Sequence, residues 1–413
     1  MEIGALGVYV GLFLGLYLQI FLLISFFEKR PERKSSYRPA RYPTVAVLIP
    51  CWNKARSLSG TVESLLELDY PKEKLSIIMV DDGSTDNTWE VAQRFANNPQ
   101  IKLFRKENEG SKYAALNFGL ARSDSELVGC LDADSFVERD ALLEIVKKFE
   151  TDKEVMAAAP IMRVNRPRNV LELMQAADYT FGIFWKKMFD NIGAISVLPG
   201  PFSFYRRELF DKIGPFRKAH HTEDMEMAFR MHANGLKITN VHTAVVYTNV
   251  PSTLGSLIRQ RTRWSRGFLE NSRDYAYMYF NRRFGNFGLL VLPFGLAGVV
   301  TGLYAAAYTL YNTASWATTR VLDMTSTGIP VHLPTLGQVE WLYAVDTGGL
   351  LPLILLALCF SIMAILLGSH IGRVRLPLSS FVSFFLLFGM LAPVWLARAA
   401  WDTLLRRERG WLT

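Results

Sequence analysis

Residues 127–134 read Leu-Val-Gly-Cys-Leu-Asp-Ala-Asp. The apolar run that opens this stretch is typical of a buried parallel strand, and two aspartates follow it. Asp132 and Asp134 can reach one cleft together, because the intervening Ala133 turns away from it. Ligands of open α/β sheets bind at the carboxyl ends of the strands. The stretch therefore predicts a strand that carries two carboxylates to a ligand site.

Strand and helix signals alternate around this stretch. They predict strands at Val45–Pro50, Leu75–Val80, Ile101–Phe104 and Leu127–Leu131, and helices from about Ser57, at Thr85–Phe95 and near Ser111–Ala121. The Ser57 hydroxyl is expected to cap its helix. Such alternation predicts a mostly parallel, doubly wound α/β sheet with helices on both faces. Asp81 and Asp82 then fall at the same edge as Asp132, and Gly83 is expected to take a positive φ in the following turn.

The amino-terminal segment predicts a membrane span. Residues 3–27 carry no charge, and at about 1.5 Å per residue they can cross a hydrocarbon core of about 30 Å. A signal peptide is the alternative, although Glu2 and the lack of Lys or Arg before the apolar run argue against it. Six basic residues follow: Lys29, Arg30, Arg33, Lys34, Arg38 and Arg41. They predict that the amino terminus lies outside and that residues 28 onward lie inside.

Three later apolar segments are long enough to span a bilayer, namely Phe287–Tyr311, Leu350–Leu367 and Leu378–Leu396. Three crossings after an inner domain would put the carboxyl terminus outside. Basic residues nevertheless stand on both sides of the last segment: Arg373, Arg375, Arg406, Arg407 and Arg409. The positive-inside rule conflicts with a full crossing there. Three alternatives stay open: a re-entrant last segment, one segment that does not fully cross, or an exceptional tail.

The composition narrows the function classes. Half of the 413 residues are apolar, and the net charge of +8 is concentrated beside the apolar segments. This distribution indicates anchoring to a membrane surface and no nucleic-acid partner. The three cysteines, Cys51, Cys130 and Cys359, form neither a disulfide framework nor a metal-ligand spacing, as expected in a reducing cytosol.

Two further motifs follow the aspartates in the chain. Thr222-Glu223-Asp224 opens a predicted helix, and Gln260-Arg261-Thr262-Arg263-Trp264 lies in a basic, amphipathic segment, residues 257–277. The succession of Asp-Asp-Gly, Asp-x-Asp, Thr-Glu-Asp and Gln-x-x-Arg-Trp resembles the membrane-embedded family 2 glycosyltransferases. That family includes the synthases of cellulose, chitin, hyaluronan and poly-N-acetylglucosamine.

The resemblance implies roles at the donor end of a type A glycosyltransferase site. Asp134 would ligate a divalent cation, and Asp132 would contact the nucleotide; oxygen ligands favour Mg²⁺ or Mn²⁺. Such a cation stabilises a leaving diphosphate. Asp81 or Asp82 would contact the uracil or the ribose, while Lys112 would contact the nucleotide or its phosphates. A solvated turn and a surface-helix lysine are the alternatives for Asp-x-Asp and for Lys112.

The first strand departs from the family pattern. The chain has Pro50-Cys51-Trp52-Asn53-Lys54 where the family usually shows Pro-x-Tyr-Asn-Glu. Pro50 is expected to line the nucleotide site, and Trp52 can replace the tyrosine as a surface on which uracil stacks. Lys54 reverses the charge of the usual glutamate.

At the acceptor end, the resemblance implies that Asp224 is the general base that takes the proton from the attacking hydroxyl. Near a helix amino terminus it would also face the positive end of the helix dipole. Glu223, Gln260 and Arg263 would bind substrate and acceptor, and Trp264 would form a stacking platform for the acceptor sugar. An amino-terminal helix cap and a membrane anchor are the alternatives for Asp224 and for the basic segment.

These observations predict a membrane-bound, inverting glycosyltransferase that moves a sugar from a UDP-sugar to a growing β-linked polysaccharide at the cytosolic face of the cell membrane, with translocation of the product as an extension. The alternatives are a non-processive enzyme that adds one sugar to a membrane lipid, and a silent membrane scaffold. The expected divisions are a first span (1–27), a basic linker (28–42), the catalytic domain (43–250), interface helices (251–285) and a carboxyl-terminal membrane region (286–413).

Overall fold

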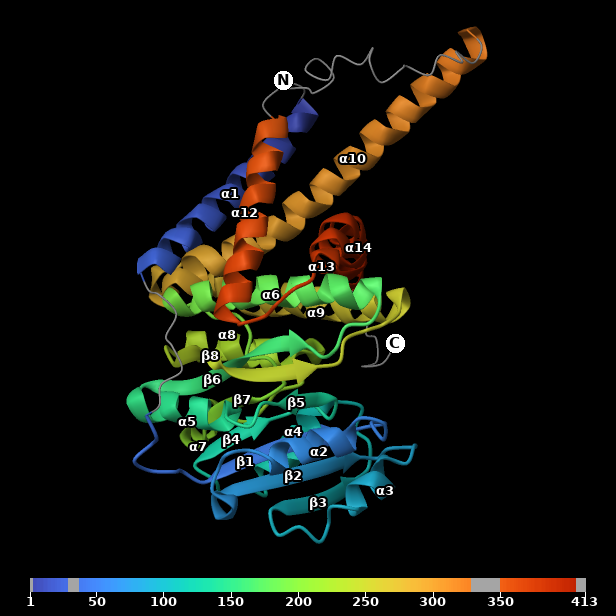
Figure 1. The fold of residues 1–413 in the computed structure, drawn as a ribbon. Coiled ribbons are helices and arrows are strands. Elements are labelled where there is room, and N and C mark those ends of the chain that lie inside the picture. The colour runs from blue at the N-terminus through green and yellow to red at the C-terminus, as the bar shows by residue number, and fades with distance from the viewer. Residues whose placement is uncertain (1–2, 29–36, 328–349, 406–413) are drawn as a thin grey trace. The chain divides into compact units, whose positions relative to one another are not determined.

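The computed structural model describes residues 3–28, 37–327 and 350–405 (Figure 1). Its strands are β1 (Val45–Cys51), β2 (Leu75–Asp82), β3 (Ile101–Lys106), β4 (Leu127–Cys130), β5 (Ser135–Val137), β6 (Val155–Val164), β7 (Ser203–Arg206) and β8 (Lys237–Thr248). Its helices are α1 (Ile3–Glu28), α2 (Leu58–Leu66), α3 (Thr88–Gln93), α4 (Lys112–Leu120), α5 (Ala141–Thr151), α6 (Val170–Asn191), α7 (Arg207–Ile213), α8 (Glu223–Ala233), α9 (Leu254–Asp274), α10 (Leu292–Thr327), α12 (Leu350–Ile371), α13 (Leu378–Ser383) and α14 (Gly389–Leu404).

The strands form one sheet in the order β3-β2-β1-β4-β7-β6-β8-β5. β1 pairs in parallel with both β2 and β4, while β7 and β5 pair antiparallel with their neighbours. The chain therefore runs outward from β1 to β3 and then returns to place β4 on the other side of β1. Ligands bind at such a switch point, outside the carboxyl ends of the strands. The expectation of a mostly parallel α/β sheet is confirmed.

Helices cover both faces of the sheet because successive side chains of a strand point to opposite faces. Val45, Val47 and Ile49 of β1 pack in one buried cluster with α2 and α5. Ala46 and Leu48 pack in a second cluster with α4, α7 and α8. The strand is apolar at these positions because each of its faces is buried, as the continuous run in the sequence indicated.

The helices between the strands depart from the sequence expectation in detail. The helix expected over Thr85–Phe95 is the shorter α3, and α2 begins at Leu58. Ser57 precedes α2 but makes no side-chain cap; its hydroxyl instead donates to the Ala133 carbonyl at 2.8 Å. The predicted cap is therefore wrong, because Ser57 has a partner across the crevice in the loop that carries Asp132 and Asp134.

A layer of amphipathic helices lies over the β6–β8 part of the sheet (Figure 1). α13 packs on α6, and α14 packs on α9. Met174 and Ala177 of α6, Leu257 of α9 and Phe384, in the π-helical turn Phe384–Phe388 between α13 and α14, share one buried cluster. These helices, the sheet and its covering helices form one unit, made of residues 22–293 and 365–405.

The other unit consists of residues 3–21, 294–327 and 350–364. In it, the Tyr304 hydroxyl of α10 donates to the Gly4 carbonyl at 2.8 Å, and Tyr17 stacks on Phe294. Over the described residues, four helical stretches are long and apolar enough to cross a membrane: Gly4–Glu28, Phe287–Ser326, Leu350–Ile371 and Leu378–Leu404.

The last of these stretches, Leu378–Leu404, belongs to the unit that carries the sheet, and contacts within that unit flank it at both ends. Before it, the Arg163 side chain of β6 donates to the Gly372 carbonyl. Near its end, Arg398 and Asp402 line the main cavity of the same unit. Part of the topological conflict depends on three basic residues that lie outside the described residues, namely Arg406, Arg407 and Arg409. Most of the linker expected at 28–42 also lies outside them.

Candidate active site

One cavity of about 1570 Å³ opens at the carboxyl ends of β1 and β4. It is bounded by the strand ends on one side and by α6, α9 and α14 on the other. Nearly all of the residues singled out in the sequence line it: Pro50, Trp52, Asp82, Lys112, Asp132, Asp134, Glu223, Asp224, Gln260, Arg263 and Trp264. Asp81 is the exception. Motifs spread over more than 200 residues of sequence thus converge on a single cavity.

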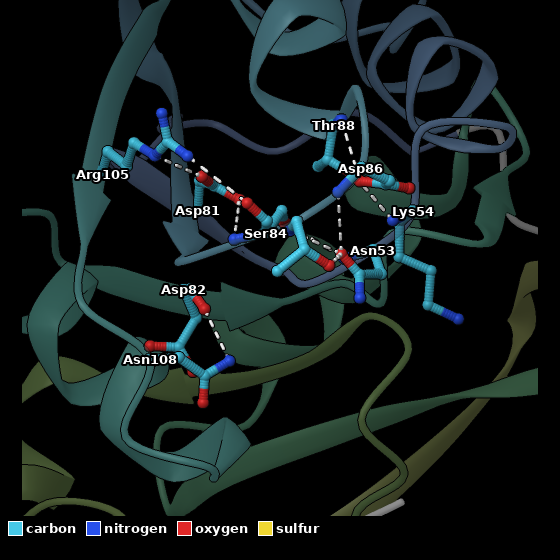
Figure 2. A network of polar contacts seen from close by, with 10 residues as sticks. Asn53, Lys54, Asp81, Asp82, Ser84, Asp86, Thr88, Arg105 and Asn108 are labelled. Atoms are coloured by element: carbon cyan, nitrogen blue, oxygen red, sulfur yellow. Dashed lines mark hydrogen bonds and ion pairs between the residues drawn. The ribbon is translucent and has the colours of Figure 1, made fainter.

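The two aspartates that end β2 have different surroundings (Figure 2). Asp81 is buried, pairs with Arg105 at 3.1 Å and accepts a hydrogen bond from the Ser84 amide. Asp82 pairs with Lys106 at 2.7 Å and lines the cavity. Gly83 has a φ of +67°, as predicted. Of the two aspartates, only Asp82 therefore faces the cavity.

Each aspartate of Asp-x-Asp is paired with a lysine. The Lys112 ammonium lies 2.5 Å from Asp132 Oδ1 and 3.4 Å from Glu223 Oε1, so it links two of the motifs. Burial opposes the charge on Lys112, but the carboxylates of Asp132 and Glu223 outweigh burial and raise its pKa. The Lys54 ammonium lies 2.6 Å from Asp134 Oδ2.

Asp224 stands in the first turn of α8, where its Oδ1 accepts a hydrogen bond from the Met225 amide at 2.9 Å. Burial and the neighbouring Glu223 carboxylate raise the pKa of Asp224 to about 6, against the opposing charges of Lys112 and Arg263. A carboxylate with a pKa near 6 is ionised at neutral pH and is a stronger base than an ordinary aspartate. The site therefore holds one carboxylate whose environment suits proton abstraction.

Close packing brings α9 against the start of α8. Gly267 of α9 faces Thr222, and a Cβ at position 267 would overlap the Thr222 side chain. Four residues on, Asn271 donates to the Thr222 hydroxyl at 3.0 Å. These contacts hold Gln260, Arg263 and Trp264 beside Asp224 within the same cavity.

Trp264 is held in place by a chain of contacts. Arg261 lies over its ring, 4.7 Å from the ring centre, and pairs with Asp178 of α6 at 2.5 Å. A guanidinium over an indole is attracted by the ring face. Because Asp178 fixes Arg261 on one side, the indole of Trp264 is oriented by a neighbouring helix.

Several lining residues were missed in the sequence: Asp178, Tyr179 and Lys186 of α6, and Arg398 and Asp402 of α14. Burial lowers the pKa of Lys186 to about 8, with Asp224 acting in the opposite direction. No motif marks the α6 residues. Arg398 and Asp402 follow the apolar run expected at Leu378–Leu396 and lie within the longer helical stretch Leu378–Leu404. Their charge beside an apolar run was a signal that could have found them, because ionisable residues in such segments are usually functional.

Comparisons with known proteins agree with this geometry. Residues 46–214 match the family model of Glycosyl transferase family 2, so the chain carries a domain of that family. The poly-beta-1,6-N-acetyl-D-glucosamine synthase of Staphylococcus epidermidis is 30% identical over 224 residues, which cover 54% of this chain and 54% of the relative. The synthase of the same name from Staphylococcus aureus (strain COL) is 31% identical over 225 residues, again 54% of each chain. The match thus spans about half the length of these relatives.

Among solved structures, the mannosyltransferase PcManGT from Pyrobaculum calidifontis, in complex with GDP-Man and Mn2+, has the same fold. The TM-score is 0.65 at 19% identity, over 98% of this chain and 99% of that chain. The likeness supports the type A glycosyltransferase fold expected from the motifs.

Proposed function

We propose that the protein is a membrane-bound, inverting glycosyltransferase that transfers an N-acetylhexosamine from a UDP-sugar to a growing β-linked polysaccharide. The observation that carries this proposal is the convergence of Asp132, Asp134, Asp224 and Trp264 on one cavity. Donor binding, proton abstraction and acceptor binding require such groups within one enclosed space. The polymer chemistry in the names of the staphylococcal relatives supports an N-acetylglucosamine donor.

The residues divide into a donor end and an acceptor end. Trp52 offers a face for the base to stack on, and Asp82 offers a carboxylate to the nucleoside. Asp224 takes the proton from the acceptor hydroxyl, while the acceptor sugar rests on Trp264. Gln260 and Arg263 of α9 lie between the donor end and the acceptor end of the site. The Arg263 guanidinium can neutralise charge on the diphosphate. With the base on the acceptor side, the acceptor oxygen bonds to the anomeric carbon as the bond to the diphosphate breaks, and a single displacement of this kind inverts the configuration.

The cavity fits a divalent cation that is shared with the substrate. Asp132 and Asp134 offer hard oxygen ligands, and the described ranges contain no group of three or more His, Cys, Asp or Glu that could hold a metal by themselves. Mg²⁺ and Mn²⁺ sites in nucleotide enzymes commonly combine one or two carboxylates with substrate phosphates. When bound, the cation would supply Lewis-acid stabilisation of the leaving diphosphate. We assign Asp134 as the ligand of the cation. Asp132, which is paired with Lys112, is assigned to contact the nucleotide.

The membrane setting follows from the apolar helices and from α9. We propose a location in the cell membrane with the sheet on the cytosolic side, where UDP-sugars are made, and a glycan or lipid-linked acceptor that arrives along α9. Sizing the product distinguishes this synthase from the alternative enzyme that adds one sugar to a membrane lipid.

A donor screen tests the proposed activity. The purified full chain with Mn²⁺ is incubated separately with UDP-N-acetylglucosamine, UDP-N-acetylgalactosamine, UDP-glucose and GDP-mannose, and nucleoside diphosphate release is measured. We expect release from UDP-N-acetylglucosamine above that from the other donors. Release from GDP-mannose alone would contradict the proposed donor class, and release from no donor would favour a silent scaffold.

Replacing Trp264 separates an acceptor site from a membrane anchor. Trp264→Ala is expected to reduce sugar transfer by about 10²-fold, because the stacking face for the acceptor is lost, while UDP affinity and membrane association persist. Trp264→Phe should keep part of the activity, since an aromatic face remains. Yield, UDP affinity and sugar transfer are measured on each purified variant.

The matched control for this experiment is Trp316→Ala. Trp316 is exposed on α10 and does not line the cavity, so its replacement should leave transfer near the wild-type rate. Normal transfer by a well-folded Trp264→Ala protein would leave only the anchor role for this residue.

A further inference from the structure

Lys54 occupies the topological switch point of the sheet. It follows the end of β1 by three residues, and its ammonium reaches Asp134, which follows the end of β4. The side chain of Lys54 is 40% exposed and that of Asp134 is 28% exposed, so the 2.6 Å contact is only partly screened by solvent. This lysine stands where the family usually carries a glutamate.

The backbone of Lys54 is fixed by contacts to the turn after β2 (Figure 2). Its amide donates to the Thr88 hydroxyl at 2.7 Å. The preceding Asn53 has a φ of +49°, and its side-chain oxygen accepts from the Thr85 amide at 2.9 Å. Asparagine adopts such a φ more readily than most residues, and the hydrogen bond to Thr85 holds it here. Because the backbone is held in this way, Lys54 stays within side-chain reach of Asp134.

An ammonium and a divalent cation cannot share the Asp134 carboxylate at close range without strong repulsion. Asp132 relieves this conflict only in part, because its Oδ1 is itself paired with the Lys112 ammonium at 2.5 Å. The diphosphate of a donor reduces this repulsion, because its negative charge attracts both the Lys54 ammonium and the divalent cation. Lys54 therefore makes occupation of Asp134 by metal depend on the presence of a diphosphate.

We propose that Lys54 competes with the divalent cation for Asp134, so that metal binds weakly alone and binds well only together with the nucleoside diphosphate. This inference rests on the proposed assignment of Asp134 as the metal ligand. It gives Lys54 a positioning role: the lysine neutralises Asp134 until donor and metal arrive together.

Mn²⁺ binding measured directly, by electron paramagnetic resonance of free Mn²⁺, tests the proposal on the full chain with and without UDP. Lys54→Met removes the charge at similar length and adds no oxygen ligand. It should bind Mn²⁺ without UDP about three- to tenfold more tightly than the wild type, the effect of removing one partly exposed charge contact. UDP should then enhance Mn²⁺ binding less in Lys54→Met than in the wild type.

Two controls accompany this measurement. Lys54→Arg keeps the charge and should bind Mn²⁺ as the wild type does. Lys102→Met removes an exposed lysine of β3 that does not line the cavity, and it should change nothing. Lys54→Ala provides a second neutral variant if Lys54→Met is poorly folded.

The outcomes separate this inference from the proposed function. Unchanged or weaker Mn²⁺ binding in both neutral variants, with Asp134→Ala still lowering the affinity, would overturn the competition alone. If Asp134→Ala leaves Mn²⁺ affinity unchanged, the metal assignment itself fails and the inference fails with it. Tighter binding in Lys54→Arg as well would show that loss of charge is not the cause, and would also overturn the proposal.

Discussion

Asp224→Asn is expected to slow sugar transfer by about 10²–10⁴-fold, because it removes the proton acceptor while keeping the size of the side chain. The amide oxygen of the substituted side chain would still accept the hydrogen bond that the Met225 amide donates to Asp224 at 2.9 Å, so the start of α8 should be retained. Initial rates of transfer and the affinity for UDP are measured on the wild type and the variant. UDP affinity should stay within about threefold of the wild type, since the base contacts the acceptor.

Asp211→Asn is the matched control, because Asp211 is exposed on α7 and outside the cavity. It should transfer sugar at the wild-type rate. Near-normal turnover by Asp224→Asn would remove Asp224 from the role of base.

The pH dependence of the transfer rate independently tests the assignment of Asp224 as the general base. A base must be ionised to accept a proton, and the pKa of Asp224 is raised to about 6 by burial and by Glu223. Transfer should therefore be near its maximum above pH 7 and should fall as pH drops through about 6, approaching tenfold per pH unit below it. Residual transfer by Asp224→Asn should lack this inflection. An unchanged inflection in the variant would assign the titration to another group.

Removing the metal is the second change with a large expected effect. Excess chelator should abolish transfer, and added Mn²⁺ or Mg²⁺ should restore it, because the leaving diphosphate loses its charge stabilisation. Asp134→Ala is expected to lose at least about 10²-fold in rate and to weaken UDP binding only when metal is present. Transfer rates are measured over a metal titration, and UDP affinity is measured with and without metal.

Asp124→Ala is the control for Asp134→Ala, since Asp124 is exposed near the opposite end of β4. It should respond to metal as the wild type does. A full rate in excess chelator would exclude a metal from the reaction.

The sequence was sufficient for the part of the site that strands carry. A buried strand has a continuous apolar run, and the aspartates that end β2 or follow β4 could therefore be assigned to one edge of the sheet. The sequence could not separate Asp81 from Asp82, because which of two adjacent carboxylates faces the cavity depends on partners such as Arg105 and Lys106, more than 20 residues away.

The helices over the cavity were harder to predict. α6 contributes Asp178 and Lys186 through tertiary contacts such as the ion pair between Asp178 and Arg261 of α9, and nothing in its local pattern marks these positions. The contact of Ser57 with Ala133 replaced an expected helix cap for the same reason: a partner distant in sequence outcompeted a local one. For the last apolar segment, length and composition predict a span, but they did not predict that Arg398 and Asp402 near its end line the cavity.

Transfer of labelled sugar into product tests the central claim most directly. The purified full chain in lipid is incubated with labelled UDP-N-acetylglucosamine and Mn²⁺, and the labelled product is sized beside that of Asp224→Asn. We expect a labelled polymer that lengthens with time from the wild type and almost none from the variant. A wild-type product limited to a single sugar on a lipid would contradict the synthase assignment, and equal labelling by wild type and variant would contradict this active site.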